Sequence, residues 1–205
     1  MNSGEAQRTE SGTEITIATN AVALTIAGSD PSGGAGLQAD LKTFQQLGCY
    51  GMSVVTLLTV QNTEGVERVE VMPVELAAQQ LAAVVGDIAP RAIKTGALGS
   101  ADMISNMAAQ LGDISVPLVV DPVLVSKHGD SLADDACIEA YRDELIPRAT
   151  VFTPNRFEAE AILDRKCVSL QEYANAAAEL QALGPEVVVL KAGEFEGERH
   201  HMVAF

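Results

Sequence analysis

Polar side chains end or interrupt the apolar runs of this sequence at four places. Gln61 follows SVVTLLTV, Asp121 lies within PLVVDPVLV, Lys191 ends VVVLK, and the segment TPNRFEAE carries Asn155 and Glu158. A carboxylate within a buried strand is unfavourable unless it is paired or binds a metal ion. Mg²⁺ binds carboxylates and phosphate oxygens, lysine binds phosphate, and a glutamine amide offers both a donor and an acceptor to a heterocycle. We interpret these residues as candidates for such a site.

Four of these five residues also have a purely structural interpretation, and for them the sequence leaves both open. Gln61 stands where a turn begins. Asn155 and Glu158 have the spacing of a helix N-cap and its N3 partner, which pair for local reasons alone. A lysine that leaves a buried strand, as Lys191 does, often only extends its ammonium group into water. Whether these residues can form one site depends on the strands and helices that carry them.

A glycine-rich turn joins a strand to a helix at 23–48. The apolar run ALTI precedes the turn GSDPSGGAG. Four apolar residues then recur at the three- and four-residue steps of a helix: Leu37, Leu41, Phe44 and Leu47. Ligands of open α/β sheets bind at the carboxyl ends of strands, and glycines let backbone N–H groups approach a ligand closely. We therefore expect the N–H groups of this turn to bind the ligand, although its spacing fits neither a P-loop nor a Rossmann fingerprint.

Strands and helices alternate along the rest of the chain. The apolar patterns predict strands at 53–60, 92–96, 117–125, 150–153, 187–191 and 201–205, and helices at 72–85, 100–112, 133–145, 156–163 and 169–184. The β-branched run 53–60 is predicted to be buried on both faces. Ser100 is a candidate N-cap, and Ser169 with Glu172 has the spacing of a capping box. The alternation predicts one α/β domain at 21–205, with a mostly parallel sheet between helices, after a flexible tail at 1–20.

The composition describes a soluble globular chain with a strong negative charge. The 205 residues are 47% hydrophobic and carry a net charge of −15, which argues against nucleic acid and anionic membranes as partners because both need a basic surface. Three cysteines without metal-ligand spacing are typical of reduced cytoplasmic thiols: Cys49, Cys137 and Cys167. We find neither an apolar span long enough to cross a bilayer nor a signal peptide, and we expect a cytoplasmic protein.

The stretch GSDPSGGAGLQADLKT at 28–43 resembles the opening of the hydroxymethylpyrimidine/phosphomethylpyrimidine kinases of thiamin biosynthesis, within the ribokinase-like superfamily. TPNRFEAEAIL likewise resembles the Asn-x-x-Glu signature of that superfamily. The resemblance implies a three-layer α/β/α sandwich with a mostly parallel central sheet. It also implies phosphorylation, dependent on ATP and Mg²⁺, of 4-amino-5-hydroxymethyl-2-methylpyrimidine and then of its monophosphate.

The resemblance also implies roles for individual residues. Five of them are implied in substrate binding: Gly28, Asp40, Gln61, Ala97 and Val123. Asn155 and Lys191 are implied in ATP and phosphate binding, and Asp121 and Glu158 in metal binding. The chain departs from the family at Ala97, where a methionine is common. We expect the smaller side chain to widen the pocket or to shift its preference.

The printed sequence lacks the late glycine-rich turn of the family, which lies at a helix N-terminus. In the resembling kinases this turn reads like His-Gly-Thr-Gly-Cys and forms an anion hole for the transferred phosphoryl group. We therefore assign no catalytic residue within this chain and expect that motif beyond Phe205. We favour a fragment of an ordinary kinase over a naturally short protein.

Two other functions remain open from the sequence. Related kinases phosphorylate hydroxymethyl groups on pyridine rings as well, so a pyridoxal or pyridoxine kinase is the near alternative. A catalytically silent pyrimidine-binding module is the second. We expect small-molecule partners, namely the pyrimidine and ATP, together with a homodimer and no binding to nucleic acid or membrane.

Overall fold

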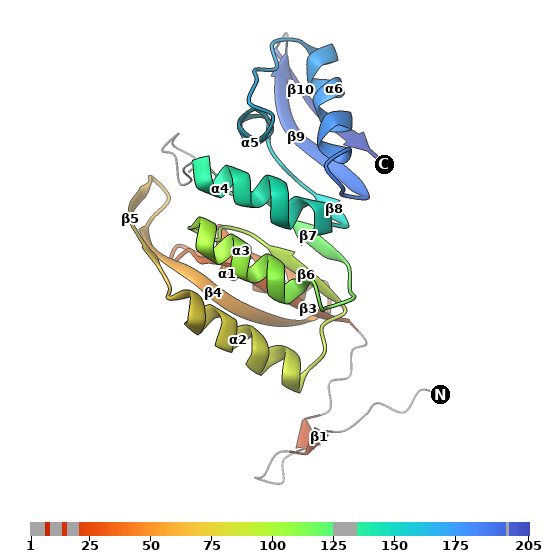
Figure 1. Cartoon of the computed structure of the whole chain (residues 1–205). Helices are drawn as coiled ribbons and strands as arrows, with labels where there is room; N and C mark the ends of the chain where they lie inside the picture. Colours follow the sequence, from red (N-terminus) through yellow and green to blue (C-terminus); the bar gives the residue numbers. More distant parts are fainter. Residues whose placement is uncertain (1–6, 9–13, 16–20, 125–134, 196) are drawn as a thin grey trace.

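Figure 1 shows the structure, a computed structural model that describes residues 7–8, 14–15, 21–124, 135–195 and 197–205. The strands are β1 (Gln7–Arg8), β2 (Glu14–Ile15), β3 (Val22–Ser29), β4 (Tyr50–Gln61), β5 (Val66–Val71), β6 (Ala92–Thr95), β7 (Leu118–Val120), β8 (Val151–Phe152), β9 (Val187–Phe195) and β10 (Glu198–Ala204). The helices are α1 (Gly36–Gln46), α2 (Val74–Asp87), α3 (Ala101–Leu111), α4 (Asp135–Ala140), η1 (Tyr141–Leu145), η2 (Ile146–Arg148), α5 (Arg156–Ile162) and α6 (Leu170–Gln181). Within the predicted tail at 1–20, the described residues form the short antiparallel pair of β1 and β2.

Eight strands form one sheet in the order β10-β9-β8-β7-β6-β3-β4-β5. Neighbouring strands from β9 to β4 are parallel, and the edge strands β10 and β5 are antiparallel to their neighbours. Helix α1 lies on one face of the sheet, and α2 and α3 lie on the other (Figure 1). The predicted α/β fold with a mostly parallel sheet is therefore confirmed. None of the described helices is long and apolar enough to cross a membrane.

The predicted helix starts form, with one difference. Ser100 is the N-cap of α3, and its hydroxyl accepts a hydrogen bond from the N–H of Met103. α3 then buries the apolar stripe that its spacing predicts: Met103, Ile104, Met107 and Leu111. Ser169 caps α6 in the same way, but the Glu172 carboxylate accepts from the N–H of Val168 rather than from that of Ser169. The reciprocal half of the predicted capping box is thus displaced by one residue.

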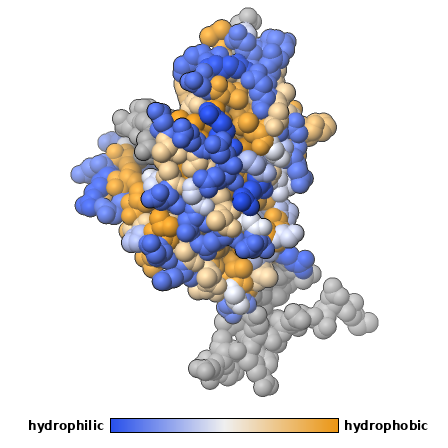
Figure 2. Space-filling view, viewed as in Figure 1, coloured by the Kyte–Doolittle hydropathy of each residue, from blue (hydrophilic) through white to orange (hydrophobic). Residues whose placement is uncertain are grey.

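The end of strand β4 extends past the parallel sheet and forms a hairpin with β5. The sequence analysis did not predict this hairpin. The pairing of β4 with β3 ends at Leu58, and the last residues of β4 pair with β5 in an antiparallel hairpin. Leu58 and Val60 are 46% and 50% exposed, so the prediction of burial on both faces is wrong for this end of the strand. Figure 2 shows hydrophobic side chains at the surface beside this hairpin. No helix in the described part of the chain covers the outer face of this two-stranded extension.

Two other predicted elements have different ends. The described part of the helix predicted at 133–145 begins as α4, widens into the π-helix η1 and closes in the 3₁₀-helix η2. Pro147 lacks the N–H that would continue an α-helix, so the tighter turn ends the segment. The strand predicted at 117–125 ends at Val120 as β7, because Asp121 and Pro122 leave the sheet.

Gly36 lies where the glycine-rich turn passes against the end of β3. Its φ is +56°, in the left-handed region, and a Cβ there would overlap the carbonyl oxygen of Gly28. We expect Gly36→Ala to lower the free energy of unfolding by about 2–3 kcal/mol in urea denaturation. Gly86→Ala is the matched control, because Gly86 lies in α2 with open space around it and alanine favours helix. Equal losses in the two variants would contradict this account.

Candidate active site

A cavity of about 460 Å³ opens at the carboxyl edge of the sheet. The glycine-rich turn after β3, the β4–β5 hairpin, the turn after β6, the end of β7 and the start of α5 all line it. The fold brings together seven of the residues singled out in the sequence: Gly28, Gln61, Ala97, Asp121, Val123, Asn155 and Glu158. Parallel strands explain this meeting, because their carboxyl ends lie along one edge of the sheet.

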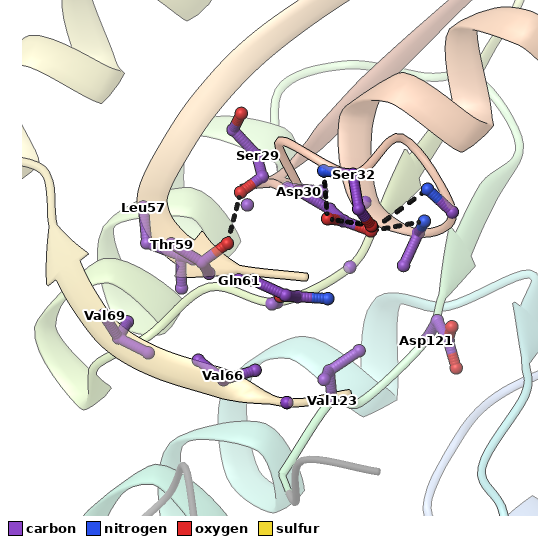
Figure 3. A pocket seen from close by; sticks show the side chains of 18 of the residues that line it. Ser29, Asp30, Ser32, Leu57, Thr59, Gln61, Val66, Val69, Asp121 and Val123 are labelled. Atoms are coloured by element: carbon purple, nitrogen blue, oxygen red, sulfur yellow. Dashed lines mark hydrogen bonds between the residues drawn. The ribbon is translucent and has the colours of Figure 1, made fainter. Parts of the chain in front are cut away.

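The β4–β5 hairpin forms one wall of the cavity. Gln61 points into the cavity (Figure 3), and no residue in the described part of the chain makes a hydrogen bond with its side-chain amide. Apolar side chains line the same wall: Leu57, Val66 and Val69. The Thr59 hydroxyl donates to the carbonyl of Ser29 at 3.0 Å, which joins this wall to the glycine-rich turn. An amide among apolar side chains suits a flat heterocycle with polar edge groups.

The glycine-rich turn uses its N–H groups internally, which corrects the expectation from the sequence. The N–H groups of Ser32, Gly34 and Ala35 donate to the Asp30 carboxylate at 2.8, 3.1 and 2.9 Å. The N–H of Gly33 donates to the carbonyl of Asp30 at 2.9 Å. An aspartate at the start of a turn commonly bonds the backbone that follows it. These four N–H groups are therefore not available to a ligand.

Asp121 and Lys191 form an ion pair across neighbouring parts of the sheet edge. Asp121 Oδ1 accepts from Lys191 Nζ at 2.7 Å and from the Thr153 hydroxyl at 3.3 Å. The carbonyl of Lys191 accepts from the buried Tyr173 hydroxyl at 2.7 Å, which holds this end of β9 in place. Asp121 lines the cavity, whereas Lys191 stands beside it rather than among its lining residues. The predicted phosphate contact of Lys191 stays a prediction.

Asn155 and Glu158 form a complete capping box at the start of α5. The Asn155 side chain accepts from the N–H of Glu158 at 3.0 Å, and the Glu158 carboxylate accepts from the N–H of Asn155 at 2.7 Å. The helix-start pairing that their spacing predicts is therefore confirmed. Both residues nevertheless line the cavity, so capping does not exclude a role toward a ligand.

The Glu158 carboxyl group has a raised pKa. Glu158 is only 3% exposed, and this burial raises the pKa of its carboxyl group to about 7. The hydrogen bond from Asn155 and the charge of Lys191 lower the pKa, while the charge of Asp121 raises it. A cation bound beside the Glu158 carboxyl group would favour its ionised form.

Asp40 is not among the residues that line the cavity, but it forms an ion pair with a lysine that is. Its Oδ2 accepts from the Thr25 hydroxyl at 2.6 Å and from Lys94 Nζ at 2.7 Å. Lys94 itself lines the cavity. The sequence analysis missed Lys94, although a lysine within the apolar strand AIKT was a visible signal. The structure thus places Asp40 behind the cavity wall rather than on it.

Comparison with known proteins identifies the family of this chain. The model of the family described as phosphomethylpyrimidine kinase matches residues 30–205. The chain belongs to this family. It is 42% identical, over 179 residues, to the hydroxymethylpyrimidine/phosphomethylpyrimidine kinase of Synechococcus elongatus, a match that covers 87% of this chain and 68% of that protein. The chain spans about two thirds of the length of the curated relatives it matches.

Two solved kinase structures superpose on most of this chain. The phosphomethylpyrimidine kinase of Clostridium difficile superposes with a TM-score of 0.83 at 42% identity, covering 90% of this chain and 80% of that one. The pyridoxal kinase of Staphylococcus aureus in complex with AMP-PCP and pyridoxal superposes with a TM-score of 0.79 at 34% identity, covering 90% and 67%. The ribokinase-like sandwich expected from the sequence is therefore confirmed.

Proposed function

We propose that this chain takes part in the ATP-dependent phosphorylation of 4-amino-5-hydroxymethyl-2-methylpyrimidine and of its monophosphate, for thiamin biosynthesis. The observation that carries this proposal is the shared cavity, in which apolar side chains and the Gln61 amide, which has no partner among the described residues, face a pair of carboxyl groups. One end suits the aminopyrimidine ring, and the other suits a metal-bound phosphate chain. Membership of a kinase family agrees with this division.

The residues divide into two groups in this proposal. Gln61 bonds the polar edge of the ring, while Gly28, Ala97 and Val123 shape the space around it and Asp40 holds the Lys94 side chain at the wall. A second group faces the phosphates and the metal: Asp121, Asn155, Glu158 and Lys191. In the first reaction the substrate hydroxyl oxygen attacks the γ-phosphorus, the bond from that phosphorus to the ADP oxygen breaks, and the hydroxyl proton passes to water. In the second reaction a phosphate oxygen of the monophosphate is the nucleophile, and the same bond to ADP breaks.

We propose ATP and Mg²⁺ as the cofactors. A kinase of the same fold was solved with AMP-PCP, which supports ATP as the phosphate donor. Groups of three or more metal-ligating side chains are not found among the described residues. Mg²⁺ typically needs only one or two carboxylates in addition to phosphate oxygens, and Asp121 with Glu158 fits that donor set. Bound Mg²⁺ would neutralise charge that develops on the transferred phosphoryl group.

We further propose a cytoplasmic homodimer. The outer face of the β4–β5 hairpin exposes Leu58 and Val60, next to an exposed ion pair between Arg68 and Glu70. A second copy, turned by a two-fold axis, would cover the apolar pair and oppose Arg68 of one copy to Glu70 of the other. Sedimentation velocity measures the mass directly, and a monomer at micromolar concentration would contradict this part of the proposal.

Steady-state formation of ADP tests the proposed reaction. In separate assays, the protein as its gene encodes it receives ATP, Mg²⁺ and one of three substrates: the pyrimidine, its monophosphate or pyridoxal. We expect turnover with the two pyrimidines and little or none with pyridoxal. A pyridoxal kinase is the second candidate, because the pyridoxal-bound kinase structure superposes closely on this chain. Turnover of pyridoxal alone would replace the first proposal with the second.

Calorimetry separates a kinase from a silent binding module. Both proteins bind the pyrimidine, but only the kinase releases ADP when ATP is added. If the protein as its gene encodes it binds the pyrimidine tightly but forms no ADP, the module is established and the kinase is overturned. The absence of pyrimidine binding would overturn both.

A further inference from the structure

The Asp30 carboxylate is buried and fully bonded within the turn that it precedes. One oxygen accepts from the N–H and the hydroxyl of Ser32 at 2.8 and 2.7 Å, and the other accepts from the N–H groups of Gly34 and Ala35 at 3.1 and 2.9 Å. Figure 3 shows these bonds converging on Asp30. A carboxylate offers about four lone-pair positions, and all of them are used here.

Because all acceptor positions of this carboxylate are filled by hydrogen bonds, the roles open to Asp30 in the site are limited. Burial acts to raise the pKa of Asp30, but the hydrogen bonds from Ser32, Ala35 and Gly34 outweigh it and the pKa is lowered. The group therefore stays ionised at neutral pH. With both oxygens occupied it accepts no further donor, and it is neither a base nor a metal ligand. Asp30 itself lines the cavity, but because its acceptor positions are filled, it influences a ligand through the residues that it holds.

Those residues form the wall of the cavity next to Gln61. Ser29, Ser32, Gly34 and Ala35 line the cavity. Gln38 of α1 adds a second tie, because its side chain accepts from the N–H of Asp30 at 2.9 Å and donates to the Ser29 hydroxyl at 2.7 Å. The carbonyl of Ser29 in turn accepts from Thr59, two residues before Gln61 in β4. The turn and the strand that carries Gln61 are thus connected through Ser29.

We propose that Asp30 is a positioning residue that sets the ring-binding end of the cavity by acting as an internal anion for the glycine-rich turn. This role rests on the proposed function, since it presumes that a pyrimidine binds beside Gln61. The carboxylate occupies the position between the amides where a phosphate would sit in an open anion-binding turn. Affinity for the pyrimidine ring therefore depends on Asp30, whereas affinity for ATP, bound near Asp121 and Glu158, does not.

Asp30→Ala tests the role, with binding of pyrimidine and of ATP measured separately by calorimetry. We expect the Kd for the pyrimidine to rise at least about tenfold, because the amides of the turn lose their shared partner. The Kd for ATP should change less than about twofold, since the phosphate end lies on other elements. Asp113→Ala removes an exposed acidic residue after α3 and is the matched control, with both Kd values unchanged.

Chemical rescue separates this role from a general loss of structure. Formate is a carboxylate small enough for the space left by Asp30→Ala, so we expect it to restore most of the pyrimidine affinity. Asp30→Asn fills that space with an amide that has one acceptor oxygen, so we expect weakened binding without rescue. Hydrogen exchange at the amides of Gly34 and Ala35 should be slow in the parent protein, fast in Asp30→Ala and slow again with formate.

The outcomes distinguish this role from the function on which it rests. A parent protein that does not bind the pyrimidine overturns the proposed function, and the positioning role with it. Unchanged pyrimidine affinity in Asp30→Ala overturns the role alone. Equal losses of pyrimidine and ATP affinity, without rescue by formate, show a merely structural residue and also overturn it.

Discussion

Gln61→Ala is expected to weaken pyrimidine binding by roughly 100-fold, equivalent to about 3 kcal/mol. The Gln61 amide points into the cavity and has no partner among the described residues, so it is free to accept and donate to the ring at once. Removal leaves a donor and an acceptor of the buried ring unsatisfied, which costs more than the loss of a solvent-exposed bond. Titration calorimetry with the pyrimidine alone measures this without any turnover.

A second glutamine serves as the control for this change. Gln79 is exposed on α2, and Gln79→Ala should leave the pyrimidine Kd unaltered. Thermal unfolding of both variants checks that the loss is local, because Gln61 makes no side-chain hydrogen bond within the described part of the chain and its removal should barely change stability. Unchanged pyrimidine affinity in Gln61→Ala would remove this residue from the site under either the kinase or the module.

The fold was predictable because its signals are local and repeated. Alternating apolar runs and helical stripes identified the parallel strands and the helices between them, and Ser100 marked a helix start. Strand β5 was missed, although the turn at 62–65 and the alternating pattern VERVEV after it are typical of a hairpin. Its two exposed glutamates and its arginine weakened the apolar signal on which the prediction relied.

The sequence predicted those residues of the site that directly follow the parallel strands, and not the others. Asp121 and Asn155 follow neighbouring parallel strands, so their meeting follows from topology. Asp40 and Lys94 are 54 residues apart, and their ion pair depends on how α1 packs on the sheet, which no local pattern records. The hydrogen bonds from the N–H groups of the turn to the Asp30 carboxylate were missed for a similar reason. Glycines showed that the backbone turns tightly, but not toward which partner its N–H groups point.

Two glutamates of α5 show how far environment overrides residue type. Glu158 and Glu160 are both buried and stand two residues apart. Burial acts to raise the pKa of Glu160 too, but bonds from Cys167, Lys166 and Arg156 outweigh it, and its pKa is lowered. Within the described part of the chain no cationic side chain contacts Glu158 directly, and its pKa rises. The sequence RFEAEAI gives no sign that these two carboxyl groups differ.

Glu158→Gln is expected to stabilise the metal-free protein while lowering its activity. Burial raises the pKa of Glu158 from 4.5 to about 7, so between these values the folded state binds more protons at this residue than the unfolded state. Stability from this group is therefore complete below pH 4.5 and lost as the pH rises through 7. Glutamine stays neutral and can still accept from the N–H of Asn155. We expect a gain of about 3 kcal/mol at pH 8 and none near pH 4.

Urea denaturation in EDTA at a series of pH values measures this difference, and Glu160→Gln is the matched control with the opposite sign. Because the pKa of Glu160 is lowered, its contribution is present above pH 4.5 and lost on acidification, so Glu160→Gln should destabilise the protein at pH 8. A loss of stability at pH 8 in Glu158→Gln would contradict the prediction. In Glu158→Gln, the gain in stability should be accompanied by weaker activation of turnover by Mg²⁺. A carboxyl group that binds a cation is an unfavourable buried charge when the cation is absent.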